Sequence, residues 1–213
     1  MELSSTRDII EKIKLLLQKP LPGKSAHSKL APFFNGNNKR RWTPLPDSRR
    51  SAVLLLLWEL EETLDIVFTL RSRNLLNHSG QISFPGGSSE AGETSIQTAL
   101  RETFEEIGVE NYNIEILGEL SELFVLPSNS IIHPVVGYSR NYLDLKINKS
   151  EVEVAFSKPL DFFSFNNIKH KEWEVGNELI HIPYWDIHPS VPLWGATAMI
   201  LAEFLEVYQS IGK

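Results

Sequence analysis

Residues 87–109 read GSSEAGETSIQTALRETFEEIGV, and this stretch predicts a helix with two different sides. Residues three and four apart lie on one face of a helix, so Glu102, Glu105 and Glu106 present their carboxylates together. We expect the opposite side to be apolar and buried. That side carries Ile96, Leu100, Thr103, Phe104 and Ile107.

The acidic face is unfavourable for an ordinary surface helix. Like charges at these spacings repel, and Gly108 marks a C-terminal end where the helix dipole disfavours each carboxylate by about 0.3–1 kcal/mol. A hard divalent ion resolves the conflict, because Mg²⁺ and Mn²⁺ prefer carboxylate oxygens and leave positions for water and phosphate. The alternative interpretation is a solvated acidic face, but the residues flanking the helix favour a metal site.

Those residues follow the pattern G-x5-E-x7-R-E-U-x-E-E-x-G-U, in which U is apolar, and the stretch resembles a Nudix box. The matching positions are Gly87, Glu93, Arg101, Glu102, Glu105, Glu106, Gly108 and Val109. Thr103 stands at the first apolar position, where its hydroxyl needs a partner, often the carbonyl one helical turn earlier.

The resemblance implies hydrolysis of a pyrophosphate bond with Mg²⁺ or Mn²⁺ as the cofactor. The metal ligands that it implies are the Gly86 carbonyl and the carboxylates of Glu102, Glu105, Glu106 and Glu151, with Glu153 as the alternative to Glu151. The same resemblance gives a catalytic set of Glu93, Arg101, Glu102 and Glu105. We expect Arg101 to pair with Glu93 and keep the carboxylates aimed. The general base stays open between Glu102 and a residue from a distant loop.

Residues 69–87 read TLRSRNLLNHSGQISFPGG and are similar to the L-L-T-x-R-S-x3-R-x3-G-x3-F-P-G-G signature of Nudix coenzyme A pyrophosphatases. Leu76 replaces the second arginine of that signature. Residues 21–27 and 194–199 also resemble this subgroup. The substrate-binding residues predicted from the segment are Arg71, Ser72, Arg73, His78, Gln81 and Phe84. For Arg71 and Arg73 the alternative is an ion pair with a surface acid, and for His78 and Gln81 it is a structural role in the loop.

A basic arm precedes the first long apolar run. It contains Lys39, Arg40, Arg41, Arg49 and Arg50. These cations can contact a distal phosphate, or they can form a solvated surface, which is the interpretation we favour for most of them.

Composition agrees with an ordinary globular enzyme. The chain has 213 residues, of which 42% are hydrophobic and 23% charged, and a formal net charge of −6 that argues against nucleic-acid binding. Cysteine is absent, which excludes disulfides and thiol catalysis. No apolar run approaches the ~18 residues of a membrane span, and the first residues do not resemble a signal peptide. We therefore expect a cytoplasmic protein with no membrane or nucleic-acid partner.

Periodicity predicts an α/β fold. We expect strands at 51–58, 65–71, 114–123, 131–139 and 178–184, helices at 8–18 and 197–211, and a short helix or turn at 160–163. Strands on both sides of one central helix suit an α/β/α sandwich with a mixed central sheet, which is also the fold that the Nudix resemblance implies. We expect an N-terminal helical extension at 1–30 and one catalytic domain at 31–213.

The function expected from these features is hydrolysis of coenzyme A or acyl-coenzyme A to 3′-phosphoadenosine 5′-phosphate and a phosphopantetheine product. A pyrophosphatase for ADP-ribose or another nucleoside diphosphate derivative is the first alternative, because it shares the box. A Nudix-fold binding module without catalysis is the second. Such modules usually have broken boxes, whereas every acid of this box is present.

Overall fold

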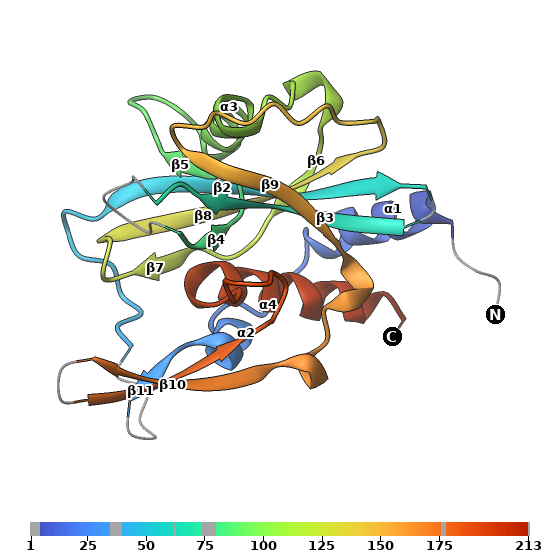
Figure 1. Ribbon diagram of the computed structural model, residues 1–213. Helices are drawn as coiled ribbons and strands as arrows, with labels where there is room; N and C mark the ends of the chain where they lie inside the picture. The colour runs from blue at the N-terminus through green and yellow to red at the C-terminus, as the bar shows by residue number, and fades with distance from the viewer. Residues whose placement is uncertain (1–4, 35–39, 62, 74–79, 176–177, 213) are drawn as a thin grey trace.

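The computed structural model describes residues 5–34, 40–61, 63–73, 80–175 and 178–212 (Figure 1). In these ranges, no helix is long and apolar enough to cross a membrane.

A mixed sheet forms the centre of the molecule. Strand β2 (Arg49–Leu60) pairs antiparallel with β3 (Thr63–Arg71) and parallel with β8 (Ser130–Ser139). The strand order is β4-β3-β2-β8-β6, with β5 on β2, β7 on β8 and β9 on β3. The remaining strands of this sheet are β4 (Ile82–Ser83), β5 (Gly86–Ser88), β6 (Glu115–Glu119), β7 (Leu123–Val125) and β9 (Val152–Pro159).

Two helices cover the two faces of this sheet, because alternate residues of β2 point to opposite sides. Leu54 and Leu56 belong to the core cluster that contains Ala99 of α3 (Ser95–Ile107), whereas Leu55 and Leu57 belong to the cluster of α4 (Gly195–Gln209). Figure 1 shows α3 on one side of the sheet and α4 on the other. The predicted α/β/α sandwich with a mixed sheet is therefore confirmed.

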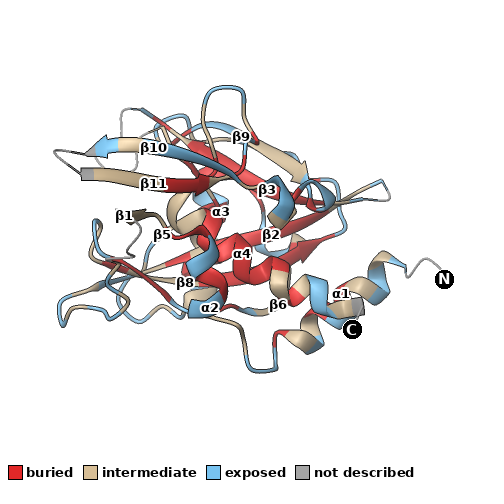
Figure 2. Ribbon diagram, turned by 90° about the horizontal axis from the view of Figure 1, so that it is seen from below, coloured by how far each residue is buried: buried red, intermediate tan, exposed pale blue. Residues whose placement is uncertain are grey.

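A small second sheet covers the other side of α4. It consists of β1 (Phe33–Phe34), β11 (Glu178–Tyr184) and β10 (Lys169–Val175), in the order β1-β11-β10. Helix α4 thus lies between two sheets, and in Figure 2 it is mostly buried. This position explains why its residues 198–205 are all buried.

Three strand predictions need correction. Strands β9 and β10 were not expected; β10 has the largely polar sequence KHKEWEV and is held by ladder hydrogen bonds to β11, whereas β9 is held by ladder hydrogen bonds to β3, far away in sequence. The expected strand 114–123 ends at Glu119, where β6 stops, and Leu123 begins a separate strand, β7. Within β6 the register on β8 shifts between Ile116 and Gly118, and Gly118 has a φ of 155°. Such a bulge bends the strand, and the pairing of β6 with β8 resumes at Gly118 and Glu119.

The N-terminal segment packs onto the main core. Helix α1 (Thr6–Leu16) begins two residues earlier than expected, with Ser5 and Asp8 forming a capping box, and it buries Ile10 and Ile13. The short helices are α2 (Lys24–His27), η1 (Ser28–Leu30), η2 (Asn111–Asn113), η3 (Leu160–Phe162), η4 (Phe165–Asn167) and η5 (Ser210–Gly212). The division of the chain at residue 30 stays a prediction.

A buried carboxylate fixes this segment to α4. Glu203 is fully buried and accepts hydrogen bonds from the backbone N–H groups of Gly23 (2.8 Å) and Ser121 (3.0 Å). Its Oε2 also lies 3.0 Å from His27 Nε2. Burial raises the pKa of Glu203, but the hydrogen bonds from His27 and Ser121 lower it by more, so the pKa lies below its usual value.

We expect Glu203→Gln to destabilise the fold by about 1–2 kcal/mol at neutral pH, because an amide replaces a charged acceptor in a buried network. A depressed pKa stabilises the fold above the unfolded pKa, and this contribution is lost as the pH falls through the folded value. The difference between variant and native protein should therefore shrink in acid. Denaturant unfolding at several pH values measures it, with Glu206→Gln on the same helix as the control. A difference that grows in acid would contradict the prediction.

Candidate active site

Helix α3 ends at Gly108, where the sequence predicts its end. Thr94 is the N-cap and forms a capping box with Gln97, and Gly108 ends the helix with a φ of 72°. Thr103 is fully buried, and its hydroxyl donates to the carbonyl of Ala99 at 2.6 Å, the partner one turn back that we expected.

The buried side of α3 differs from the expected one. Phe104 was assigned to the apolar side, but it is 47% exposed, whereas Glu106 is only 1% exposed. The buried side runs through Ala99, Thr103 and Glu106 because the helix is rotated to place this carboxylate against the sheet. One of the three glutamates therefore faces inward.

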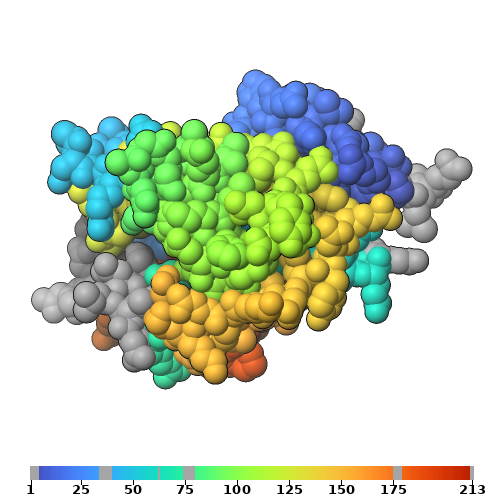
Figure 3. All heavy atoms as spheres, turned by 90° about the horizontal axis from the view of Figure 1, so that it is seen from above, coloured from blue at the N-terminus to red at the C-terminus, as the bar shows by residue number. Residues whose placement is uncertain are grey.

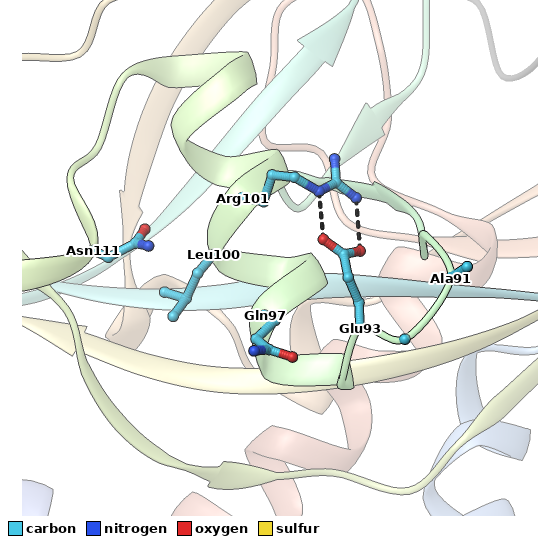
Figure 4. Close-up of a pocket in the computed structure, with 7 residues that line it drawn as sticks. Ala91, Glu93, Gln97, Leu100, Arg101 and Asn111 are labelled. Atoms are coloured by element: carbon cyan, nitrogen blue, oxygen red, sulfur yellow. Dashed lines mark hydrogen bonds and ion pairs between the residues drawn. The ribbon is translucent and has the colours of Figure 1, made fainter.

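Arg101 holds the loop before α3 against the helix. Its Nε donates to Glu93 at 2.7 Å and its Nη2 at 3.0 Å, a two-point contact visible in Figure 4. This confirms the expected Arg101–Glu93 pair. The same guanidinium reaches Glu102 (2.9 Å) and Glu105 (3.0 Å). The hydrogen bond from Arg101 lowers the pKa of Glu93 to about 2, so Glu93 is ionised at neutral pH.

An open cavity of about 420 Å³ lies on the outer side of this pair (Figure 4). Its lining is Ala91, Gly92, Glu93, Gln97, Leu100, Arg101 and Asn111. Glu102, Glu105 and Glu106 are not among these residues, so we do not assign chemistry to this cavity.

Glu106 occupies the centre of the site. Arg71 Nη1, at the end of β3, donates to its Oε1 at 3.0 Å, and the backbone N–H of Gly86 donates to its Oε2 at 3.3 Å. Burial raises the pKa of Glu106 to about 7, with Arg71 and the Gly86 N–H opposing it and the charges of Glu102 and Glu151 adding to it. Near neutral pH this carboxyl is readily neutralised by a proton or by a cation.

Glu102 packs against the backbone of β5. A Cβ atom at Gly87 would lie 2.5 Å from the Glu102 Cδ atom, so the carboxylate fills the space that a side chain would need. Burial raises the pKa of Glu102, Arg101 opposes this, and Glu105 and Glu151 add to it. Glu105 is itself about half exposed and pairs with Arg101.

A loop far along the chain brings the fourth carboxylate to the helix. The backbone N–H groups of Lys146 and Asn148 donate to the carbonyls of Ile107 and Glu106, at 2.8 and 2.9 Å. Figure 3 shows this segment bordering α3 on the surface. Asn148 Nδ2 also donates to Glu151 Oε1 at 3.2 Å. Glu151 therefore acts on the pKa values of Glu102 and Glu106, whereas the alternative, Glu153, lies 3.9 Å from Arg73.

The chemistry of these groups suits a divalent cation, although the described part of the chain holds no group of three or more His, Asp or Glu side chains arranged as a metal site. Carboxylate oxygens are the donors that Mg²⁺ and Mn²⁺ prefer. The charges of Glu102 and Glu151 raise the pKa of Glu106, and the charge of Glu151 also raises the pKa of Glu102; a cation relieves that repulsion. Arg71 and Arg101 now contact three of the predicted ligands, so binding of a cation would exchange some of these contacts.

The predicted substrate-binding residues divide into groups. Arg71, Gln81 and Phe84 line a cavity of about 470 Å³ on the α4 side of the sheet, which we name the α4-side cavity. Phe84 is 1% exposed and stacks on Phe68, with ring centroids 5.3 Å apart.

Among the described residues, Ser72 and Arg73 do not line this cavity. Ser72 is buried, and its N–H donates to the Glu151 carbonyl at 2.8 Å. Arg73 is exposed beside Glu153, and His78 and Leu76 lie outside the described residues. Ser72 thus holds in place the loop that carries Glu151.

The residues predicted to bind substrate do not include several others that line the α4-side cavity. Trp194 and Thr197 line the α4-side cavity, as do Ser128 from the β7–β8 turn and Ser130 at the start of β8. The similarity of residues 194–199 to the coenzyme A subgroup was the available signal for the first pair. For Ser128 the signal was the predicted turn Pro127-Ser128-Asn129, whose place in the fold allows contact with the substrate, whereas Ser130 carries no local pattern that indicates a binding role.

Comparisons with known proteins agree with this geometry. The NUDIX domain model matches residues 48–180. The chain is 39% identical over 113 residues to Nudix hydrolase 3 of Caenorhabditis elegans, covering 52% of this chain and 47% of that protein. It is 33% identical over 155 residues to the peroxisomal coenzyme A diphosphatase ndx-8 of the same organism, covering 70% of this chain and 64% of that protein.

In both cases the chain spans less than two thirds of the relative's length. Among solved structures, the crystal structure of a Nudix hydrolase from M. smegmatis, RenU, has a TM-score of 0.56 at 16% identity. That match covers 80% of this chain and 96% of the other and shows a shared fold.

Proposed function

The chain belongs to the NUDIX domain family, and from this premise we propose that it is a divalent-metal-dependent pyrophosphohydrolase of nucleoside diphosphate derivatives. The observation that carries the proposal is the buried Glu106 carboxylate, which lies between Arg71 and the Gly86 N–H with a pKa raised to about 7. A carboxylate held in this way, beside two others, is a strong ligand for a cation.

Each residue has a distinct part in this proposal. The carboxylates of Glu102, Glu105, Glu106 and Glu151 and the Gly86 carbonyl would hold Mg²⁺ or Mn²⁺. When bound, such an ion neutralises phosphate oxygens and lowers the pKa of water. Arg71 would donate to a phosphate oxygen once its contact with Glu106 is released. Arg101 and Glu93 hold the helix in place, and Glu102 is a candidate base, with a residue from a distant loop as the alternative.

Coenzyme A or an acyl-coenzyme A is the substrate that we favour. The segment 69–87 supports it, as does the similarity to a protein named as a coenzyme A diphosphatase. ADP-ribose or another nucleoside diphosphate derivative is the second candidate, because the carboxylate site suits any diphosphate. Other relatives are named only as Nudix hydrolases. A cytoplasmic location stays a prediction.

A panel of diphosphates tests this function. With Mg²⁺ or Mn²⁺ we expect cleavage of coenzyme A to 3′-phosphoadenosine 5′-phosphate and phosphopantetheine, with a higher kcat/KM than for ADP-ribose. Chelation should abolish turnover, and added metal should restore it, because the carboxylates alone leave the phosphate charge uncompensated. Product identification by mass spectrometry is the measurement. Preference for ADP-ribose would select the second candidate, and metal-dependent binding without turnover of any diphosphate would indicate a non-catalytic module.

A further inference from the structure

The α4-side cavity has a polar wall built by one face of β2. Arg49, Ser51 and Val53 line the cavity, and the next residues on that face, Leu55 and Leu57, are fully buried in the core. The face thus changes from apolar to polar and then to charged along a single strand. Ser51 Oγ lies 2.8 Å from Ser130 Oγ on the neighbouring strand, so hydroxyl groups continue this wall.

Arg49 is the charged end of that wall. Its Nη2 donates to the Ser128 carbonyl at 2.9 Å, which holds the guanidinium at the rim of the cavity. In the described part of the chain, no carboxylate pairs with Arg49, and the guanidinium has further N–H donors beyond the one used. Arg40 lines the same cavity, donates to the Phe124 carbonyl at 2.5 Å and lies over the Trp42 ring at 5.0 Å.

The cavity therefore has two positively charged regions. One is Arg71 beside Gly86 and Gly87, next to the carboxylates. The other is Arg49, which lies four residues before Val53, the register partner of Gly86. At about 3.3 Å per residue, this separation along the strand is ~13 Å, which a nucleotide and an arginine side chain together can span. Trp194 and Ile200 supply apolar lining of the same cavity.

We propose that the Arg49 end of the α4-side cavity binds a second phosphate of the substrate, a monoester separate from the scissile diphosphate. Arg49 is then a specificity residue. The inference rests on the proposed function, since it assigns a position to the part of the substrate beyond the diphosphate. Coenzyme A carries such a group as its 3′-phosphate, whereas 3′-dephospho-coenzyme A and ADP-ribose lack it. A guanidinium–phosphate contact is charge-assisted and bidentate, which gives it both strength and direction.

The test compares coenzyme A with 3′-dephospho-coenzyme A in the native protein, Arg49→Gln, Arg49→Lys and Arg50→Gln. Arg50 is the matched control, because it is the next residue on β2, is exposed and does not line the cavity. We expect the native kcat/KM to favour coenzyme A by about 10-fold or more, since one charge-assisted contact is worth at least ~1.4 kcal/mol. Arg49→Gln should remove this preference by lowering kcat/KM for coenzyme A alone. Arg49→Lys should keep part of it, and Arg50→Gln should leave it unchanged.

A binding measurement separates this proposal from the proposed function. By calorimetry, adenosine 3′,5′-bisphosphate should bind the native protein about 10-fold more tightly than AMP, and Arg49→Gln should abolish the difference. The phosphate subsite is supported if this holds even when neither diphosphate is cleaved. Equal kcat/KM for coenzyme A and 3′-dephospho-coenzyme A in the native protein would overturn the subsite, and so would an equal fall of both values in Arg49→Gln. Either result would leave the hydrolase assignment intact. Equal binding of the bisphosphate and AMP would overturn it as well.

Discussion

Glu106→Gln is expected to lower kcat with Mg²⁺ by at least ~10³-fold, because removing a metal-binding carboxylate forfeits several kcal/mol of charge stabilisation. An amide has the size of the carboxyl, and its single oxygen can still accept from one of the two donors, Arg71 or the Gly86 N–H. The loss should therefore come from weaker metal binding, which titration with Mn²⁺ measures. The control is Glu110→Gln, an exposed glutamate just beyond the helix that changes the net charge equally.

A stability measurement on the same variant shows that it is folded. The raised pKa of Glu106 means that the acid form is favoured in the fold, so stability falls as the pH rises from about 4.5 to about 7 and then stays constant. Above pH 7 the metal-free variant should gain up to about 3 kcal/mol over the native protein, and below pH 4.5 the gain should vanish. Intact turnover with Mg²⁺ in Glu106→Gln would sink the assignment of Glu106 as a metal ligand.

The second large effect concerns Gly87. Gly87→Ala places a methyl group on the Glu102 carboxylate, which must swing away from β5. The obstacle is the end of a flexible side chain and the φ of Gly87 lies outside the left-handed region, so the fold should lose less than ~1 kcal/mol. Activity with Mg²⁺ should fall about 100-fold, because a displaced ligand no longer reaches the cation.

For Gly86→Ala we expect a large loss of stability, in contrast to the small loss expected for Gly87→Ala. Gly86 has a φ of 151°, and a Cβ atom there would overlap the Ala52 carbonyl oxygen and lie 2.6 Å from the Val53 Cα atom. Backbone cannot move as a side chain does, so we expect a destabilisation of about 3 kcal/mol. Gly92→Ala, where φ is 87° and no atom lies within 4 Å, measures the backbone strain alone. Equal unfolding midpoints for the Gly86 and Gly87 variants would refute this distinction.

Those parts of the site were predictable whose contacting residues lie close together in the sequence. The helix end at Gly108 and the Arg101–Glu93 pair form as expected because each uses contacts within one loop and helix. Strand β9 was missed because its hydrogen bonds go to β3, which is far away in sequence. Strand β10 was missed because its own sequence, KHKEWEV, is polar, although its partner β11 follows it directly. Pairing with a neighbouring strand overrides local propensity.

The sequence alone determined the helix, its acidic face and the family, since helical spacing by itself places Glu102, Glu105 and Glu106 on one side. Only the tertiary structure decided which of them is buried. Glu106 faces the sheet and Glu105 faces water, although both are glutamates and are neighbours in the sequence. The burial of Glu106, the effect of Glu151 on its pKa and the place of Arg49 in the cavity lining all depend on segments that come from elsewhere in the chain. No spacing within the helix encodes those contacts, because a pKa follows from the whole surrounding of a group.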